Sequence, residues 1–202
     1  MSKVSAIQLN SGPNIKVNLF DIKTFIEKIA ESDSKMVILP ENFALMPEHD
    51  NDYIKHAEEL GDGQIQNYIS NLASTYNIWI VAGTIPIKSS DNDRVMASTI
   101  TYDNKGNRVS QYNKIHLFDV TLPKSNESYN ESKYFMPGEK IEVIDTPIGR
   151  AGIACCYDLR FPELFRLQHE EKIEVIIIPA SFTEQTGKVH WETLIKARAI
   201  EN

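Results

Sequence analysis

Residues 152–163 have the sequence GIACCYDLRFPE, an apolar run that breaks at two cysteines and turns directly into a predicted helix. At such an elbow we expect the carbon atoms of the Cys156 side chain to be buried while its sulfur faces a cleft. The helix start behind it offers unpaired backbone N–H groups, which favour a thiolate. The stretch therefore predicts a strand and a helix with a cysteine nucleophile between them.

The segments around this elbow alternate between predicted strands and helices. Short apolar runs typical of strands occupy 4–9, 36–39, 78–84, 142–145, 150–155 and 175–178, and helical stripes cover 19–31, 65–76, 162–171 and 191–201. Two more strands, 98–102 and 108–112, are joined through the turn DNKG. These mixed units predict an α/β layered fold with both parallel and antiparallel pairing.

Length and charge limit the classes of function. The chain has 202 residues, enough for one sizeable core, and its formal net charge of −7 leaves no basic stripe for a nucleic-acid backbone. No apolar run is long enough to cross a bilayer, and the N-terminus does not resemble a signal peptide. We therefore expect a cytoplasmic protein that binds neither nucleic acid nor membranes.

The two cysteines are adjacent, so they cannot connect distant segments, and a disulfide between them would strain the peptide. We expect reduced thiols. Cys155 should point opposite to Cys156 on a strand and fill an inert core position. The spacing of His116, His169 and His190 suits no metal site, so neither a metal nor a cofactor is expected.

Three reactive side chains follow predicted strands: Glu41 after 36–39, Lys114 after 108–112, and Cys156 at the elbow. Because residues at strand ends converge at the carboxyl edge of a sheet, these side chains can share one cleft. A thiol that attacks a carbonyl needs a base, a partner for the developing oxyanion, and an acid for the leaving nitrogen. Glutamate, lysine and cysteine together supply all three.

Each residue also has a structural interpretation. Glu41 alone suits the first turn of a helix, Lys114 alone suits a solvated surface, and a free cysteine suits the core. Their combination is what favours catalysis. Asp158 and Arg160 are expected to form a structural ion pair that steadies the elbow. The segment 119–139 has few aliphatic residues and is expected to be a long irregular loop that borders the site.

At these residues the chain resembles the nitrilase superfamily of carbon–nitrogen hydrolases. LPEN at 39–42 is similar to the family block that carries the general-base glutamate. YNKIHLFD at 112–119 is similar to its lysine block, and CCYDLRFPE at 155–163 to its nucleophile block. The resemblance runs from the first strand to the last residue, and it implies an amidase.

The resemblance implies a role for each candidate residue. Cys156, directly before the Tyr-Asp pair, is the expected nucleophile, and Glu41 takes its proton and passes it to the departing amine. Lys114 and the backbone N–H of Tyr157 are expected to stabilise the oxyanion. Glu131 matches a second glutamate that supports the lysine and the substrate. The implied reaction is amide hydrolysis through a thioester, without a metal.

Within the superfamily, SFTEQTGKVHWE at 181–192 and ARAIE at 197–201 resemble the branch with deaminated glutathione amidase and omega-amidase. Both enzymes cleave an amide on a substrate that carries a 2-oxo acid. RFP at 160–162 favours the first, because omega-amidases tend to have alanine in place of the proline. Omega-amidase activity on 2-oxoglutaramate is the alternative. Arg160 and Lys188 are candidates for binding the substrate carboxylate, as are the polar residues of the 119–139 loop.

The resemblance implies an α-β-β-α sandwich in a single carbon–nitrogen hydrolase domain, residues 1–202. Family members continue beyond the ARAIE helix with further strands, another helix and a tail used in dimer contacts. The chain stops at Asn202. We therefore expect a fragment that lacks the C-terminal strands, which leaves a sheet edge and apolar faces uncovered. The full-length form is expected to be a homodimer.

Two other classes of function stay open. A non-catalytic scaffold or binding protein would keep the sandwich, although the retention of Glu41, Lys114 and Cys156 together argues against it. A redox sensor would use Cys155 and Cys156, and it would need neither the glutamate nor the lysine.

Overall fold

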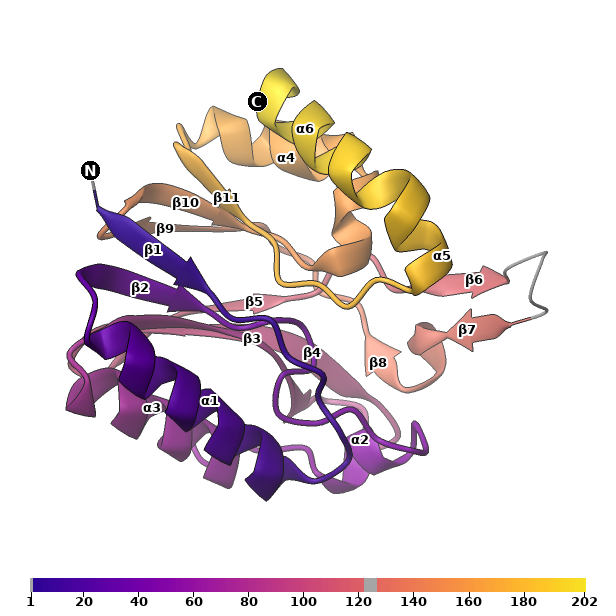
Figure 1. Cartoon of the computed structure of the whole chain (residues 1–202). Coiled ribbons are helices and arrows are strands. Elements are labelled where there is room, and N and C mark those ends of the chain that lie inside the picture. The colour runs from indigo at the N-terminus through magenta and orange to yellow at the C-terminus, as the bar shows by residue number, and fades with distance from the viewer. Residues whose placement is uncertain (1, 122–126) are drawn as a thin grey trace.

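The computed structural model of the chain describes residues 2–121 and 127–202. Its elements form four stacked layers, in which helices cover the outer faces of two facing β-sheets (Figure 1). The N-terminal part of the chain, drawn in indigo and magenta, builds one sheet with its helices (Figure 1). The C-terminal part, drawn in orange and yellow, builds the other. This arrangement confirms the expected α-β-β-α sandwich.

The first sheet has six strands in the described chain, in the order β1-β2-β3-β4-β5 with β8 beside β4. The strands are β1 (Lys3–Ala6), β2 (Ser34–Ile38), β3 (Trp79–Lys88), β4 (Val95–Tyr102), β5 (Arg108–Asn113) and β8 (Phe135–Met136). β1, β2 and β3 are parallel, whereas β4 is antiparallel to both β3 and β5. Because β2 and β5 therefore run in the same direction, the residues that follow them lie at the same edge.

Two helices, α1 (Ile15–Ala30) and α3 (Gln64–Thr75), cover the outer face of the first sheet (Figure 1). Asn14 begins α1, because its side chain accepts hydrogen bonds from two backbone N–H groups of the first turn. Buried apolar side chains recur at helical spacing: Leu19, Ile22 and Ile26 on α1, and Ile65, Ile69 and Leu72 on α3. The short helix α2 (Asp52–Lys55) lies between α1 and α3 in sequence.

The second sheet has three strands in the described chain, in the order β11-β10-β9. They are β9 (Glu142–Thr146), β10 (Gly149–Ile153) and β11 (Val175–Ile177), with β9 antiparallel and β11 parallel to β10. The helices α4 (Pro162–Glu170) and α6 (Glu192–Glu201) cover its outer face (Figure 1). The short helix α5 (Glu184–Thr186) and the π-helical turn η3 (Gly187–Trp191) lead into α6. Among the described residues, no helix has the length and apolarity needed to cross a membrane.

An apolar core fills the space between the two sheets. Its buried members are Met36, Val81, Tyr112, Ile144, Ala151, Ile153, Cys155, Cys156 and Ile177. Full burial of a side chain such as valine, isoleucine or methionine contributes about 1.5–3 kcal/mol to the free energy of unfolding. The two cysteines of the elbow therefore lie in the layer where both sheets are held together, and this layer fixes their position.

The expectation of an irregular loop over 119–139 is wrong for most of its described part. β6 (Asp119–Thr121) pairs with the antiparallel strand β7 (Ser128–Asn130), and the 3₁₀ turn η1 (Glu131–Lys133) then leads into β8. Residues 122–126 lie outside the described residues. Because these strands are only two or three residues long and β6 and β7 are largely exposed, they show no alternation that a sequence pattern can detect.

The helix expected over 162–171 is confirmed, but the expectation that the elbow turns directly into it is wrong. A 3₁₀ turn, η2 (Cys156–Arg160), comes first, and the α-helix α4 begins only at Pro162. The proline explains the late start, because it is favoured at the first position of a helix and disfavours the helical conformation in the residue before it.

The first sheet packs so tightly at Gly83 that it leaves no room for a side chain. A Cβ atom at Gly83 would overlap the carbonyl oxygen of Pro40 and lie 2.9 Å from that of Leu39. Because backbone atoms cannot move away without shifting the segment that leads to Glu41, we expect Gly83→Ala to destabilise the protein by about 3 kcal/mol. Denaturant unfolding measures the change. Gly12→Ala is the matched control, since nothing lies within 4 Å of its Cβ position; equal stability of the two variants would contradict the prediction.

Candidate active site

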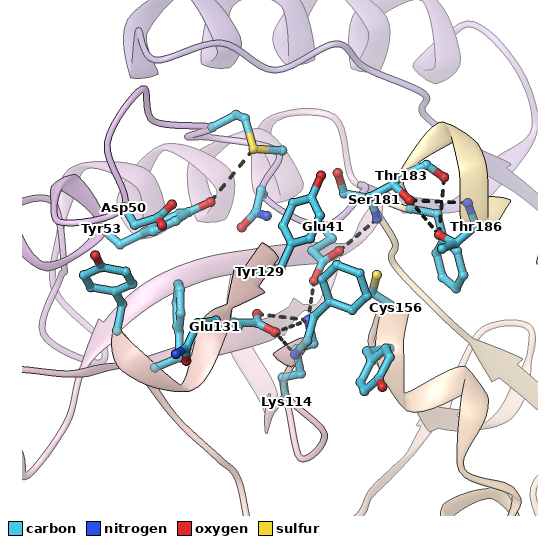
Figure 2. Close-up of a pocket in the computed structure, with 18 of the residues that line it drawn as sticks. Glu41, Asp50, Tyr53, Lys114, Tyr129, Glu131, Cys156, Ser181, Thr183 and Thr186 are labelled. Carbon is cyan, nitrogen blue, oxygen red and sulfur yellow. Dashed lines mark hydrogen bonds and ion pairs between the residues drawn. The ribbon is translucent and has the colours of Figure 1, made fainter. Parts of the chain in front are cut away.

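A buried ammonium group between two carboxylates forms the floor of the site. Lys114 Nζ lies 2.8 Å from Glu41 Oε1 and 2.9 Å from each carboxylate oxygen of Glu131 (Figure 2). Glu41 follows β2, Lys114 follows β5, and Glu131 begins η1. The side chains of Lys114 and Glu41 are only 2% and 5% exposed. Since removal of one partner from a buried ion pair costs about 3–5 kcal/mol, this cluster ties three segments of the chain together.

The charges of this cluster keep Lys114 protonated. Burial alone would lower the pKa of Lys114, but the carboxylates of Glu41 and Glu131 outweigh burial and raise the pKa well above its ordinary value. Burial also raises the pKa of Glu131, although the Lys114 ammonium opposes this change. Lys114 is therefore a hydrogen-bond donor that can stabilise negative charge, and it does not act as a base.

Cys156 is the first residue of η2, and its sulfur lies at the Glu41 side of this cluster (Figure 2). Its φ of 45° is in the left-handed region, which side chains other than glycine rarely adopt. Its backbone N–H donates to the Pro179 carbonyl at 2.9 Å, and its sulfur lies beside the Glu41 carboxylate (Figure 2). The structure thus brings the three predicted residues Glu41, Lys114 and Cys156 into one cluster.

The thiolate expected at this turn is not favoured. Burial raises the pKa of the Cys156 thiol well above its ordinary value, and the negative charge of Glu41 raises it further, against the opposing effect of Lys114. A 3₁₀ turn of five residues offers too little helix dipole to reverse these effects. Cys156 therefore carries a neutral thiol, and the Glu41 carboxylate lies beside it (Figure 2).

Cys155 is fully buried, as expected, but the expectation that it points away from Cys156 is wrong. Its sulfur lies 3.4 Å from Glu41 Oε1, in the same cluster. Strand alternation does not apply here, because β10 ends at Ile153 and the left-handed conformation of Cys156 changes the direction of the chain.

The sequence analysis missed a backbone group of Ser181. The Ser181 N–H donates to Glu41 Oε2 at 2.8 Å (Figure 2). A backbone donor has no characteristic side chain, so no residue pattern marks it. Its position just past β11 was the available signal, because the other site residues also follow strands.

The expected ion pair between Asp158 and Arg160 is absent from the described contacts. The fully buried Asp158 carboxylate instead accepts hydrogen bonds from the Tyr112 hydroxyl at 2.6 Å and the Cys155 N–H at 2.8 Å. It also accepts the His116 N–H at 2.9 Å and lies 2.7 Å from His116 Nδ1. Asp158 therefore joins the segment that carries Lys114 to the turn that carries Cys156.

Arg160 lines the same cavity as Cys156. Its guanidinium group lies over the rings of Tyr157 and Phe182, 5.6 and 5.5 Å from their centroids, and 3.2 Å from His190 Nδ1. Lys188, the other candidate for binding a carboxylate, forms an exposed pair with Glu184 and does not line this cavity. Arg160 is therefore better placed than Lys188 to bind a carboxylate in this cavity.

A cavity of about 380 Å³ opens above these groups (Figure 2). Aromatic side chains form much of its wall: Tyr53, Phe118, Tyr129, Tyr134, Phe135, Tyr157 and Phe182. Such an apolar wall with a few charged groups at its base suits a small organic substrate. Among the described residues, no group of three or more His, Cys, Asp or Glu side chains is arranged to hold a metal ion.

The chain matches the carbon-nitrogen hydrolase family over residues 3–202. A deaminated glutathione amidase of Yersinia enterocolitica is 41% identical over 202 residues, which cover 100% of this chain and 70% of that protein. The omega-amidase NIT3 of Saccharomyces cerevisiae is 36% identical over 206 residues, which cover 99% of this chain and 70% of that protein.

Solved structures agree with the sequence matches. The crystal structure of Saccharomyces cerevisiae Nit3, a member of branch 10 of the nitrilase superfamily, has a TM-score of 0.85 at 33% identity. The match covers 98% of this chain and 71% of that one. This chain therefore belongs to the carbon–nitrogen hydrolase family, and the expected resemblance to the nitrilase superfamily is confirmed.

Asp158 provides a test of how the site is held together. Asp158→Ala would leave the buried donors of Tyr112, His116 and Cys155 without their acceptor, so we expect a loss of about 3 kcal/mol or more in unfolding free energy. The matched control is Asp145→Ala, because Asp145 is 82% exposed and pairs with Arg150 at the surface. That change should stay within about 0.5 kcal/mol. If urea unfolding gave a similar loss of unfolding free energy for both variants, Asp158 would not be the residue that holds these segments together.

Proposed function

We propose that this chain hydrolyses the amide bond of a small 2-oxo-acid amide through a thioester on Cys156. The observation that carries the proposal is that a thiol, a carboxylate and an ammonium group, those of Cys156, Glu41 and Lys114, line one cavity side by side (Figure 2). The membership of the chain in the carbon–nitrogen hydrolases, and the amidase names of its relatives, support this reaction.

In the first half of the proposed reaction, Glu41 accepts the thiol proton as the sulfur of Cys156 attacks the amide carbonyl carbon. The new carbon–sulfur bond leaves a negative charge on the carbonyl oxygen. The Lys114 ammonium and the backbone N–H of Tyr157 stabilise this charge. Base assistance is needed because the thiol of the free protein is neutral.

In the second half, the oxyanion collapses, the carbon–nitrogen bond breaks, and Glu41 gives its proton to the departing amine. Glu41 then takes a proton from a water molecule, which attacks the thioester. Breakage of the carbon–sulfur bond releases the carboxylic acid and returns the proton to Cys156. Glu131 holds the Lys114 ammonium in place through both of its carboxylate oxygens.

The substrate that the proposal favours is deaminated glutathione. The support comes from the relative of that name at 41% identity and from the RFP sequence at 160–162. A cavity of about 380 Å³ also has room for more than a five-carbon amide. Omega-amidase activity on 2-oxoglutaramate is the alternative, supported by the NIT3 relative. In either substrate, Arg160 is positioned to bind a carboxylate.

The proposal extends to the whole protein. We infer one catalytic domain over residues 1–202, a cytoplasmic location and a homodimer in the full-length form. Sedimentation analysis of the full-length protein tests the dimer, and a monomer at micromolar concentration would exclude it.

The catalytic roles predict distinct effects of two substitutions. Cys156→Ala should abolish both turnover and the acyl-enzyme that intact-protein mass spectrometry detects, because the nucleophile is gone. Glu41→Gln should lower kcat by about 10²-fold or more, because an amide cannot accept the thiol proton. Glu59→Gln is the matched control, since Glu59 pairs with Lys88 at the surface outside the cavity. Turnover that survives Cys156→Ala would refute the assignment of Cys156 as the nucleophile.

The substrate is tested by product assays on deaminated glutathione and 2-oxoglutaramate. Hydrolysis of the first releases cysteinylglycine, and hydrolysis of the second releases ammonia. We expect a higher kcat/KM for deaminated glutathione. Arg160→Met should raise KM about 10-fold or more, because one charge-assisted hydrogen bond is lost. A neutral amide without a carboxylate is the control, and an equal loss on that substrate would exclude carboxylate binding by Arg160.

A further inference from the structure

Cys155 is a buried polar group for which the proposed reaction has no role. Its side chain is 0% exposed, and its sulfur lies 3.4 Å from Glu41 Oε1. Its backbone is held as well, because the Cys155 N–H donates to Asp158 Oδ2 at 2.8 Å. The position of this thiol is therefore set by two buried carboxylates.

The Glu41 carboxylate accepts hydrogen bonds from three different segments. Oε1 accepts the Lys114 ammonium at 2.8 Å and the Cys155 thiol at 3.4 Å, and Oε2 accepts the Ser181 N–H at 2.8 Å. Two carboxylate oxygens have about four lone-pair positions. Three donors therefore fix the plane of the carboxylate and leave one position for the Cys156 thiol.

We propose that Cys155 is a positioning residue, whose S–H donates to Glu41 and holds the carboxylate in the orientation that accepts the proton of Cys156. This inference rests on the proposed role of Glu41 as the base.

The charges around Glu41 support a thiol donor at this place. The titratable groups that face Glu41 from the other elements of the site are Lys114, Glu131, Tyr53 and the two cysteines. Burial raises the pKa of the Cys155 thiol well above its ordinary value, and the charge of Glu41 raises it further. Cys155 therefore keeps its proton at neutral pH and can donate it. Donation stabilises the anionic form of Glu41, so loss of the S–H makes the carboxylate more basic.

Two variants that differ by one donor test the proposal. Cys155→Ala removes the donor without adding volume, and Cys155→Ser restores a hydroxyl donor at the same Cβ. For the alanine variant we expect the acidic limb of the pH profile of kcat/KM to move upward by about half a pH unit or more, because the donor is weak but the acceptor is charged. For the serine variant we expect a limb at or below that of the unchanged protein.

Thermal unfolding of both variants separates this effect from a loss of packing. A lower melting temperature together with an unmoved acidic limb in both variants would overturn the proposal, since it would leave Cys155 with a packing role alone. A downward shift in Cys155→Ala would also overturn it, because that sign requires a thiolate at Cys155.

A second measurement does not depend on amide turnover. In Cys155→Ala the remaining cysteine is Cys156, so its alkylation by iodoacetamide can be followed from pH 6 to 10 by intact mass. We expect the pH midpoint of Cys156 alkylation to be higher in Cys155→Ala than in the unchanged protein. In Cys155→Ser we expect this midpoint to return to the value of the unchanged protein. If the unchanged protein hydrolyses no amide, the proposed function fails, and the alkylation midpoints still test the contact. Identical alkylation midpoints in all three proteins would exclude a hydrogen bond from Cys155 that positions Glu41.

Discussion

The Lys114 ammonium, held between the carboxylates of Glu41 and Glu131, is the interaction on which the rest of the site depends. Removing these charges from water is costly, and the cost is offset only when all of them meet at hydrogen-bonding distance. The cluster therefore requires the ends of β2, β5 and the start of η1 to lie at one point. The packing of the two sheets provides that point, and the same packing keeps water away and strengthens each interaction.

Asp158 adds the connection between this cluster and the turn that carries Cys156. It accepts hydrogen bonds from the segment before and after Lys114 and from the residue before Cys156, so one carboxylate fixes both segments. Cys156 is held in a left-handed conformation that an unsupported chain would rarely adopt. The arrangement stabilises the reactive groups in place before any substrate binds, and this is the condition for effective electrostatic stabilisation of an oxyanion.

The protonation state of the thiol follows from a competition between burial and helix geometry. A helix start lowers a thiol pKa only when several N–H groups point at the sulfur. Here the turn is short, and the nearest charge is a carboxylate. Burial therefore has the larger effect, and the proton of Cys156 moves only when a base accepts it. The carboxylate of Glu41 thus has two effects: it pairs with the ammonium of Lys114, and its charge raises the pKa of the Cys156 thiol further.

Local sequence alone determined the helices, the longer strands and the positions of Glu41, Lys114 and Cys156 just after strands, because periodicity and strand ends depend on neighbouring residues. It did not determine the partners of those side chains. The contacts of Asp158 span 42 and 46 residues, that of Cys155 with Glu41 spans 114, and that of the Ser181 N–H spans 140. Only the tertiary structure decided these contacts, because they form where separate segments converge, and the direction of a side chain past a strand end follows no repeating pattern.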